Sequence, residues 1–136
     1  MSDLVAAART AYGAFAARDA ERMREVCHPE IEIEVPTAAL AGRGGPYRGA
    51  EGIAAYLDDL DRIWDELELH PHEFTDAGDD RVVIFGRVVT RRERTRNDLP
   101  SVWVLEFRDG LVFRVHVYSD AAQVAAQVRR PGPDGR

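Results

Sequence analysis

The feature of this 136-residue chain that most restricts its fold is a pair of apolar runs near its C-terminus. Residues 99–107 and 111–118 are rich in β-branched and aromatic side chains, and Arg108-Asp109-Gly110 lies between them. Asp-Gly supplies the positive φ angles of a tight turn, so the two runs predict a β-hairpin. Because side chains alternate along a strand, one face of this hairpin is almost wholly apolar. That face is predicted to consist of Ser101, Trp103, Leu105, Phe107, Leu111, Phe113, Val115 and Val117.

The opposite face of the hairpin mixes valines with Glu106, Arg114, His116 and Tyr118. A sheet with one dry face and one partly polar face usually carries helices on the first and a partner chain on the second. We therefore expect the core, and any pocket, on the Trp103 face and a subunit contact on the other.

The N-terminal half predicts three helices. Apolar residues at helical spacing indicate a first helix with Tyr12 and Phe15 inward, and Asp19 is placed to cap a second that ends at His28-Pro29. The longest amphipathic helix covers residues 53–64, and its outer face is predicted to carry Asp58, Asp59 and Asp61. Between them, residues 30–35 alternate glutamate with isoleucine or valine, which is typical of a half-exposed strand.

The remaining segments complete the predicted order. Residues 37–49 are rich in glycine and predict a loop, with 42–45 as a flap over the pocket. Strands are expected at 67–75 and 81–94, the second bending back at Asn97-Asp98. Ser119-Asp120 is predicted to cap a short helix over 121–128, followed by a disordered tail at 129–136. This order predicts one α+β domain, residues 1–128, in which a curved antiparallel or mixed sheet wraps around three helices.

The net charge of −6 argues against non-specific attraction to nucleic acid or anionic lipid. A single cysteine, Cys27, allows no intrachain disulfide and suits a reducing compartment. No apolar run approaches membrane-spanning length, and the N-terminus has no signal-peptide pattern. We therefore expect a cytoplasmic protein with no contact to nucleic acid or membrane.

Several phrases resemble the SnoaL-like group of the nuclear-transport-factor-2-like superfamily. They are 12–19 with His28-Pro29, then Tyr47-Arg48-Gly49 with Gly52, then 107–111 and 118–120, and the resemblance covers roughly residues 4 to 127. It implies a cone-shaped fold with a pocket between curved sheet and helices, and a homodimer formed through the back of the sheet. The fold alone does not fix an activity.

The resemblance to relatives with known chemistry is incomplete. Ketosteroid isomerases place a phenol where Tyr12 falls, but their two aspartates fall on Val35 and Trp103. Limonene-epoxide hydrolases share an arginine with Arg87, whereas their two carboxylates fall on Val89 and Val117. Neither chemistry is supported by these residues.

The candidate site follows from the predicted inner face. We expect an apolar pocket that binds a small hydrophobic molecule, without metal or cofactor. The ligand-binding candidates are Phe15, Val35, Tyr56, Trp64, Trp103, Leu105 and Val117. The alternative function is a cyclase or isomerase acting on a hydrophobic carbonyl compound by general acid–base catalysis, with Tyr12, Arg87 and Asp120 as catalytic candidates. A core role for Tyr12, an outer-face position for Arg87 and a helix cap for Asp120 stay open beside it. A third hypothesis is a partner-binding module that uses only the outer face of the sheet.

His70 and His72 share one face of a predicted strand, a spacing that suits a metal-binding cupin barrel. Cupins consist almost entirely of strands, whereas this chain opens with helices, so surface histidines are the favoured interpretation. Arg91, Arg92, Arg94 and Arg96 predict a solvated hairpin tip, which we expect to pair with Glu30, Glu32 and Glu34.

Overall fold

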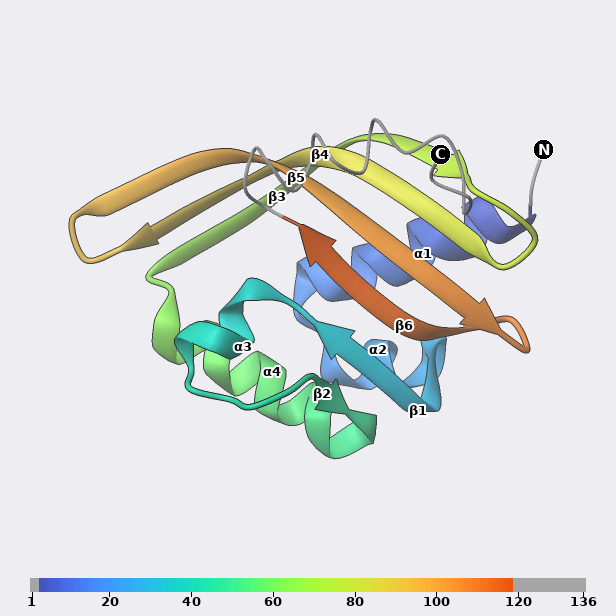
Figure 1. Cartoon of the computed structure of the whole chain (residues 1–136), viewed down its shortest axis with the longest axis horizontal. Coiled ribbons are helices and arrows are strands. Elements are labelled where there is room, and N and C mark those ends of the chain that lie inside the picture. The colour runs from blue at the N-terminus through green and yellow to red at the C-terminus, as the bar shows by residue number, and fades with distance from the viewer. Residues whose placement is uncertain (1–2, 119–136) are drawn as a thin grey trace.

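A computed structural model describes residues 3–118 of the chain. Four helices and six strands follow one another, with the helices confined to the first half (Figure 1). The helices are α1 (Asp3–Ala17), α2 (Ala20–Val26), α3 (Pro36–Leu40) and α4 (Gly49–Ile63). The strands are β1 (Cys27–Glu34), β2 (Tyr47–Arg48), β3 (Glu66–Asp76), β4 (Arg81–Arg92), β5 (Thr95–Arg108) and β6 (Leu111–Tyr118).

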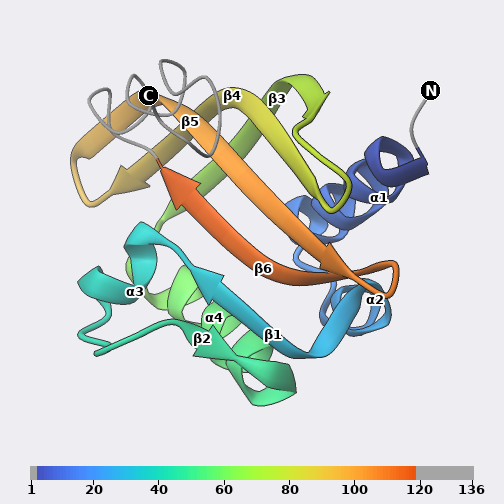
Figure 2. The same ribbon diagram turned by 45° about the vertical axis from the view of Figure 1, so that its right-hand side comes forward.

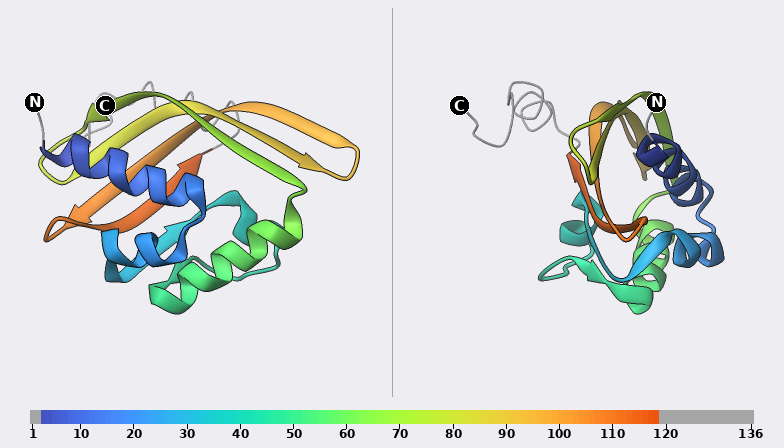
Figure 3. Two further views of the ribbon diagram at one scale, coloured as in Figure 1. Left: turned by 180° about the vertical axis from the view of Figure 1, so that it is seen from behind. Right: turned by 90° about the vertical axis from the view of Figure 1, so that its right-hand side faces the viewer.

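The six strands form one sheet in the order β2-β1-β6-β5-β4-β3 (Figure 2). Only β1 and β6 pair in parallel, and the other neighbours are antiparallel. The sheet curves strongly, and α1, α2 and α4 lie on its concave side (Figure 3). This confirms the predicted α+β class with a mixed sheet wrapped around helices. The predicted cap at Ser119-Asp120, the helix over 121–128, the boundary at 128 and the tail lie outside the described residues.

The helices form where their apolar residues recur at helical spacing. On α1, Tyr12 and Phe15 are buried, as predicted, and so are Ala8 and Ala11 on the same side of the helix. Asp19 caps α2, because its Oδ1 accepts a hydrogen bond from the backbone N–H of Arg22 at 3.2 Å. These inward faces meet the concave side of the sheet in a single core.

The hairpin between β5 and β6 confirms the turn at Asp109-Gly110, which both have positive φ. Its inner face differs from the prediction because a β-bulge lies between Glu106 and Phe107. The bulge shifts the alternation by one residue, so that Phe107 pairs with Val112, which is fully buried. Leu111 and Phe113, predicted to point inward, are not in the core. The Phe113 ring lies instead under the Arg108 guanidinium, 3.8 Å from the ring centroid.

Two predicted connections differ from the structure. Residues 37–49 are not a plain loop, since they hold most of α3 and all of β2; Pro36 occupies the first turn of α3, where its missing N–H costs nothing. The strand β4 ends at Arg92, and the chain reverses at Glu93-Arg94 rather than at Asn97-Asp98. Glu93 takes a left-handed φ of 57°, which a scan for glycine-rich turns does not detect.

Strands β3 and β4 approach each other unusually closely at Gly86. A Cβ built on this glycine would lie 2.3 Å from the backbone oxygen of His70. The register between the two strands shifts at the same place, between Pro71 and Glu73. Only glycine fits here without displacing β3.

Asp59 on α4 was predicted to face solvent but is fully buried. Its carboxylate accepts hydrogen bonds from Arg43 Nε at 2.5 Å, the Tyr47 hydroxyl at 2.6 Å and Arg62 at 2.5 Å. The hydrogen bond from Arg43, with those from Tyr47 and Arg62, holds the pKa of Asp59 well below its usual range, although burial opposes this. These bonds fasten residues 43–47 to α4.

None of the helices within residues 3–118 combines the length and the apolar character needed to cross a membrane.

Candidate ligand-binding cavity

An apolar cavity of about 140 Å³ lies between the concave face of the sheet and the segment that contains α3 and the end of α4. Its walls come from α3, α4 and strands β3 to β6. They are formed by Val35, Pro36, Thr37, Leu40, Tyr56, Leu60, Trp64, Leu67, Leu69, Val88, Thr90, Asn97, Leu99, Trp103 and Val117. An apolar cavity of about 150 Å³ is large enough for a benzene-sized ring.

The sheet wall of the cavity follows from strand register. Val88 pairs with Leu99, Thr90 with Asn97, and Trp103 with Val117, so these side chains project from the same face. Trp103 forms the deep end of this wall, since it is 3% exposed and its ring makes edge contacts with Tyr12 and Phe15. The predicted inward orientation of Trp103 is confirmed.

Two hydroxyl groups in the wall have no hydrogen-bond partner among the described residues. Tyr56 is 4% exposed and Thr90 is 8% exposed, and both line the cavity. Burial raises the pKa of the Tyr56 phenol, so it stays protonated and able to donate. Buried polar groups are normally hydrogen-bonded, and unpartnered ones call for an explanation.

The wall opposite the sheet holds one hydrogen bond between lining side chains of the described residues. The Trp64 indole N–H donates to Thr37 Oγ1 at 3.0 Å, which ties the residue after α4 to α3. The mouth lies beside Leu40 and Leu99, because these two lining residues are 45% and 37% exposed. Among residues 3–118, none that lines the cavity is a carboxylate or a histidine.

The structure brings most of the predicted ligand-binding residues together. Val35, Tyr56, Trp64, Trp103 and Val117 line the cavity. Phe15 and Leu105 do not: they are buried in the core, behind the cavity wall.

The catalytic candidates are not brought together. Tyr12 is buried against Trp103, with ring centroids 5.0 Å apart, but it does not line the cavity, and burial raises its pKa to about 12. For Arg87 the sequence left two positions open, a catalytic one in the pocket and one on the outer face, and the structure shows the outer one. Residues 82, 84, 86, 88 and 90 form the inner face of β4, so Arg87 lies outside and pairs with Asp98 at 2.7 Å. Asp120 lies outside the described residues.

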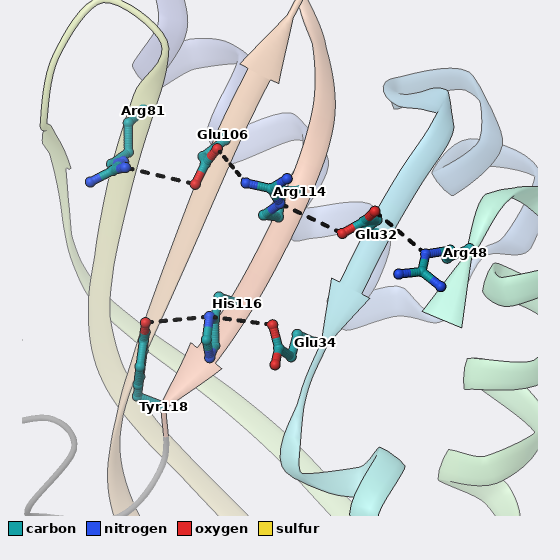
Figure 4. Close-up of polar contacts among 8 residues, drawn as sticks. All are labelled: Glu32, Glu34, Arg48, Arg81, Glu106, Arg114, His116 and Tyr118. Atoms are coloured by element: carbon teal, nitrogen blue, oxygen red, sulfur yellow. Dashed lines mark hydrogen bonds and ion pairs between the residues drawn. The ribbon is translucent and has the colours of Figure 1, made fainter. Parts of the chain in front are cut away.

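The outer face of the sheet carries a chain of ion pairs (Figure 4). From β4 to β2, alternating charges link Arg81, Glu106, Arg114, Glu32 and Arg48 at 3.3 to 3.7 Å. The prediction that the tip arginines pair with the β1 glutamates is therefore wrong, since Arg91 contacts Asp65 and Glu66 instead.

A second row on this face joins Glu34, His116 and Tyr118 (Figure 4). His116 stacks on the Tyr118 ring at 4.2 Å between centroids and places Nδ1 3.7 Å from Glu34. These residues share the outer face, as predicted. His70 and His72 are exposed on β3, and His70 pairs with Glu68 at 3.1 Å. Within the described residues no group of three or more metal-ligating side chains occurs.

Sequence reasoning missed ten lining residues: Pro36, Thr37, Leu40, Leu60, Leu67, Leu69, Val88, Thr90, Asn97 and Leu99. Residues 82–89 are apolar on both faces apart from Gly86 and Arg87, so alternation does not tell which face of β4 points inward, and Gly86 marks only a close backbone approach. No periodic signal marks α3 either, because its five residues are too few for a helical period.

A curved sheet that wraps around helices and encloses an apolar cavity is a cone-shaped α+β fold, and this is the fold class of the chain. The profile of the SnoaL-like domain matches residues 8–115, and the chain belongs to this family. The predicted resemblance is confirmed. A search of curated proteins gave no match.

Solved structures show the same fold. A nuclear-transport-factor-2-like protein of unknown function from Burkholderia pseudomallei is 25% identical, with a TM-score of 0.77 over 91% of this chain and 95% of that one. TerC, co-crystallised with polyporic acid, is 29% identical, with a TM-score of 0.76 over 91% and 96%. IdmH from Streptomyces antibioticus, a proposed polyketide cyclase, is 19% identical, with a TM-score of 0.67 over 93% and 99%.

Proposed function

We propose that this domain binds a small, flat, mostly apolar molecule that carries a hydrogen-bonding oxygen. The observation that carries the proposal is a cavity lined by apolar side chains, in which two buried hydroxyls, of Tyr56 and Thr90, lack partners among the described residues. Ligand sites in proteins typically combine an apolar wall with a few polar groups that orient the ligand. The co-crystallisation of TerC with polyporic acid supports small-molecule binding by this fold.

In this proposal the ring of the ligand lies against Trp103 and Val117, and its oxygen accepts hydrogen bonds from Tyr56 and Thr90. Acid–base catalysis is not part of it. General acid–base chemistry needs a titratable group within hydrogen-bond reach of the substrate, and in the described part of the chain the titratable side chain that lines the cavity is the Tyr56 phenol, whose pKa is raised.

The chain carries its own reporter of binding, because both of its tryptophans, Trp64 and Trp103, line the cavity. We expect acetophenone to change tryptophan fluorescence in a saturable way. Ethylbenzene, which has nearly the same shape but no oxygen, should bind more weakly. The Tyr56→Phe and Thr90→Val variants should lose this preference for the ketone.

A cavity-filling variant tests the location. Val88→Phe should abolish saturable binding, whereas Leu111→Phe, a similar enlargement of a partly exposed residue outside the core, should leave it intact. Equal binding by both variants, or no saturable response to either compound in the unmodified protein, contradicts the proposal.

We also propose that the protein is a cytoplasmic homodimer that associates through the outer sheet face. Support comes from the half-buried row of Arg114, His116 and Tyr118 on β6, and from a single buried cysteine, which suits a reducing compartment. Light scattering should give twice the monomer mass, and His116→Glu, placed beside Glu34, should lower it.

A further inference from the structure

The tip of the β4–β5 hairpin extends beyond the other strands, past α3 and the C-terminal end of α4 (Figure 1 and Figure 3). A second depression lies at this tip, lined by Arg92, Glu93, Arg94 and Thr95 together with Leu40, Trp64 and Asn97. The last three residues also line the apolar cavity. The depression therefore adjoins the mouth of the cavity.

The arginines of this depression differ from most arginines of the described chain. Arg91, the preceding residue, is held by Asp65 and Glu66, and Arg87 is held by Asp98. The side chains of Arg92 and Arg94 are exposed and make no ion pair or hydrogen bond within residues 3–118. Two guanidinium groups thus line one depression without a bound carboxylate, in a chain whose net charge is −6.

One acidic group, Glu93, also lines the depression. Its backbone is fixed, because its N–H donates to Asp65 Oδ2 at 2.7 Å and its carbonyl accepts from Arg91 at 3.2 Å. Its carboxylate pairs with no cation in the described part of the chain. Two arginines against one glutamate leave the lining with one net positive charge.

We propose that the ligand is an amphiphilic organic anion, with its ring in the apolar cavity and its acidic group held by Arg92 and Arg94 at the mouth. This inference rests on the proposed function and extends it to the chemical class of the ligand. Guanidinium groups bind carboxylates in a planar, two-point geometry, so they select an acid over its neutral analogue. Asn97 lines both the apolar cavity and the depression, so its amide lies between the place proposed for the ring of the ligand and the place proposed for its acidic group.

The test uses two matched probes, 3-phenylpropionate and 3-phenylpropanamide, which differ in charge but carry the same ring on the same two-carbon chain. Titration calorimetry at low ionic strength should show the acid binding about five- to tenfold more tightly, because exposed ion pairs each contribute little. The preference should shrink in 1 M NaCl, where charges are screened beyond about 3 Å.

The Arg92→Gln/Arg94→Gln double variant should bind both probes with the affinity that the unmodified protein has for the amide. Arg22→Gln/Arg24→Gln removes the same charge from the exposed side chains of α2 and should keep the preference. Glu93→Gln should strengthen binding of the acid only.

The outcomes separate the two proposals. If both probes bind equally in the unmodified protein, or the preference survives in the Arg92/Arg94 variant, the mouth does not select an anion, and the cavity proposal stands. If neither probe binds and acetophenone fails as well, the cavity itself is not a ligand site.

Discussion

Arg43 Nε lies 2.5 Å from Asp59 Oδ2, although the Asp59 side chain is fully buried and Arg43 is 40% exposed. The pair joins the turn after α3 to the middle of α4. Because α3 and α4 form one side of the cavity, this contact helps to hold the helical wall in place against the sheet.

The first prediction concerns Asp59→Asn. The variant loses a buried charge that accepts four hydrogen bonds, two from Arg43 and one each from Tyr47 and Arg62. A hydrogen bond to a charged group contributes about 1.5–3 kcal/mol, and the amide that replaces the carboxylate can still accept part of this set. We expect a loss of about 2 kcal/mol in the free energy of unfolding at pH 7, measured by urea denaturation. Asp61→Asn, which breaks an exposed contact with Arg18, should change it by less than about 0.5 kcal/mol.

The same carboxylate gives a pH dependence. The folded-state pKa of Asp59 is lowered, so its contribution to stability is fully present above the unfolded pKa of about 3.9 and is lost as the pH falls below that value. The gap between the unmodified protein and Asp59→Asn should therefore stay constant above about pH 5 and narrow progressively as the pH falls below about 4, toward the lowered pKa of the folded state. A gap that stays constant below pH 4 contradicts the assignment.

Gly86→Ala tests the close approach of β3 and β4. The new methyl group meets the backbone oxygen of His70, which moves only if the strand moves. We expect a loss of about 2 kcal/mol or more, as is typical of overpacking in a rigid environment. Gly44→Ala, where a Cβ meets nothing within 4 Å, is the matched control and should be near neutral. Equal melting temperatures for the two variants would refute the close approach.

Thr90→Val separates stability from binding. The substitution keeps the shape of the side chain and removes a buried hydroxyl that has no partner within the described residues. An unpartnered buried hydroxyl costs about 1–3 kcal/mol, so the melting temperature of the free protein should rise or stay the same, while affinity for a ketone falls. A clear drop in stability would mean that the hydroxyl is already satisfied.

Cys27 should be chemically inert in the folded protein. It is buried at the start of β1, and burial raises its pKa to about 12, so almost no thiolate is present at pH 8. A disulfide reagent should react many times more slowly with the native protein than with protein in 6 M guanidinium chloride. Rapid native reaction would place the thiol in contact with solvent.

Much of the fold could be predicted from alternation and helical spacing, because these patterns report directly which face of an element is buried. The inward positions of Tyr12, Ile33 and Trp103 all follow from them. The deviations arise where the alternation of inward and outward side chains along a strand shifts or cannot be read from the sequence. The bulge after Glu106 exchanged Phe113 for Val112. On β4 both faces are largely apolar, so the sequence left the orientation of Arg87 open, and the structure places it outside.

The site was less predictable than the fold for a related reason. Asp59 has the sequence context of a surface carboxylate, and only the return of residues 43–47 onto α4 buries it. Likewise, Thr90 and Leu99 line the cavity because β4 and β5 are longer than the apolar runs within them. Both facts depend on contacts between distant segments, which no local pattern encodes.

The parallel pairing of β1 with β6 has a consequence for biosynthesis. The last described strand is inserted between the first and the fifth, so the sheet cannot close while residues 111–118 remain in the ribosome. Until then, the buried side chains Ile31 and Ile33 of β1 lack the neighbouring strand β6. Strand pairing between segments that are distant in sequence is slow, and it leaves nascent chains prone to aggregation. A nascent chain that ends before Leu111 should be digested by proteases along its whole length. A nascent chain whose residues 111–118 have also left the ribosome should become resistant to proteases in a single step.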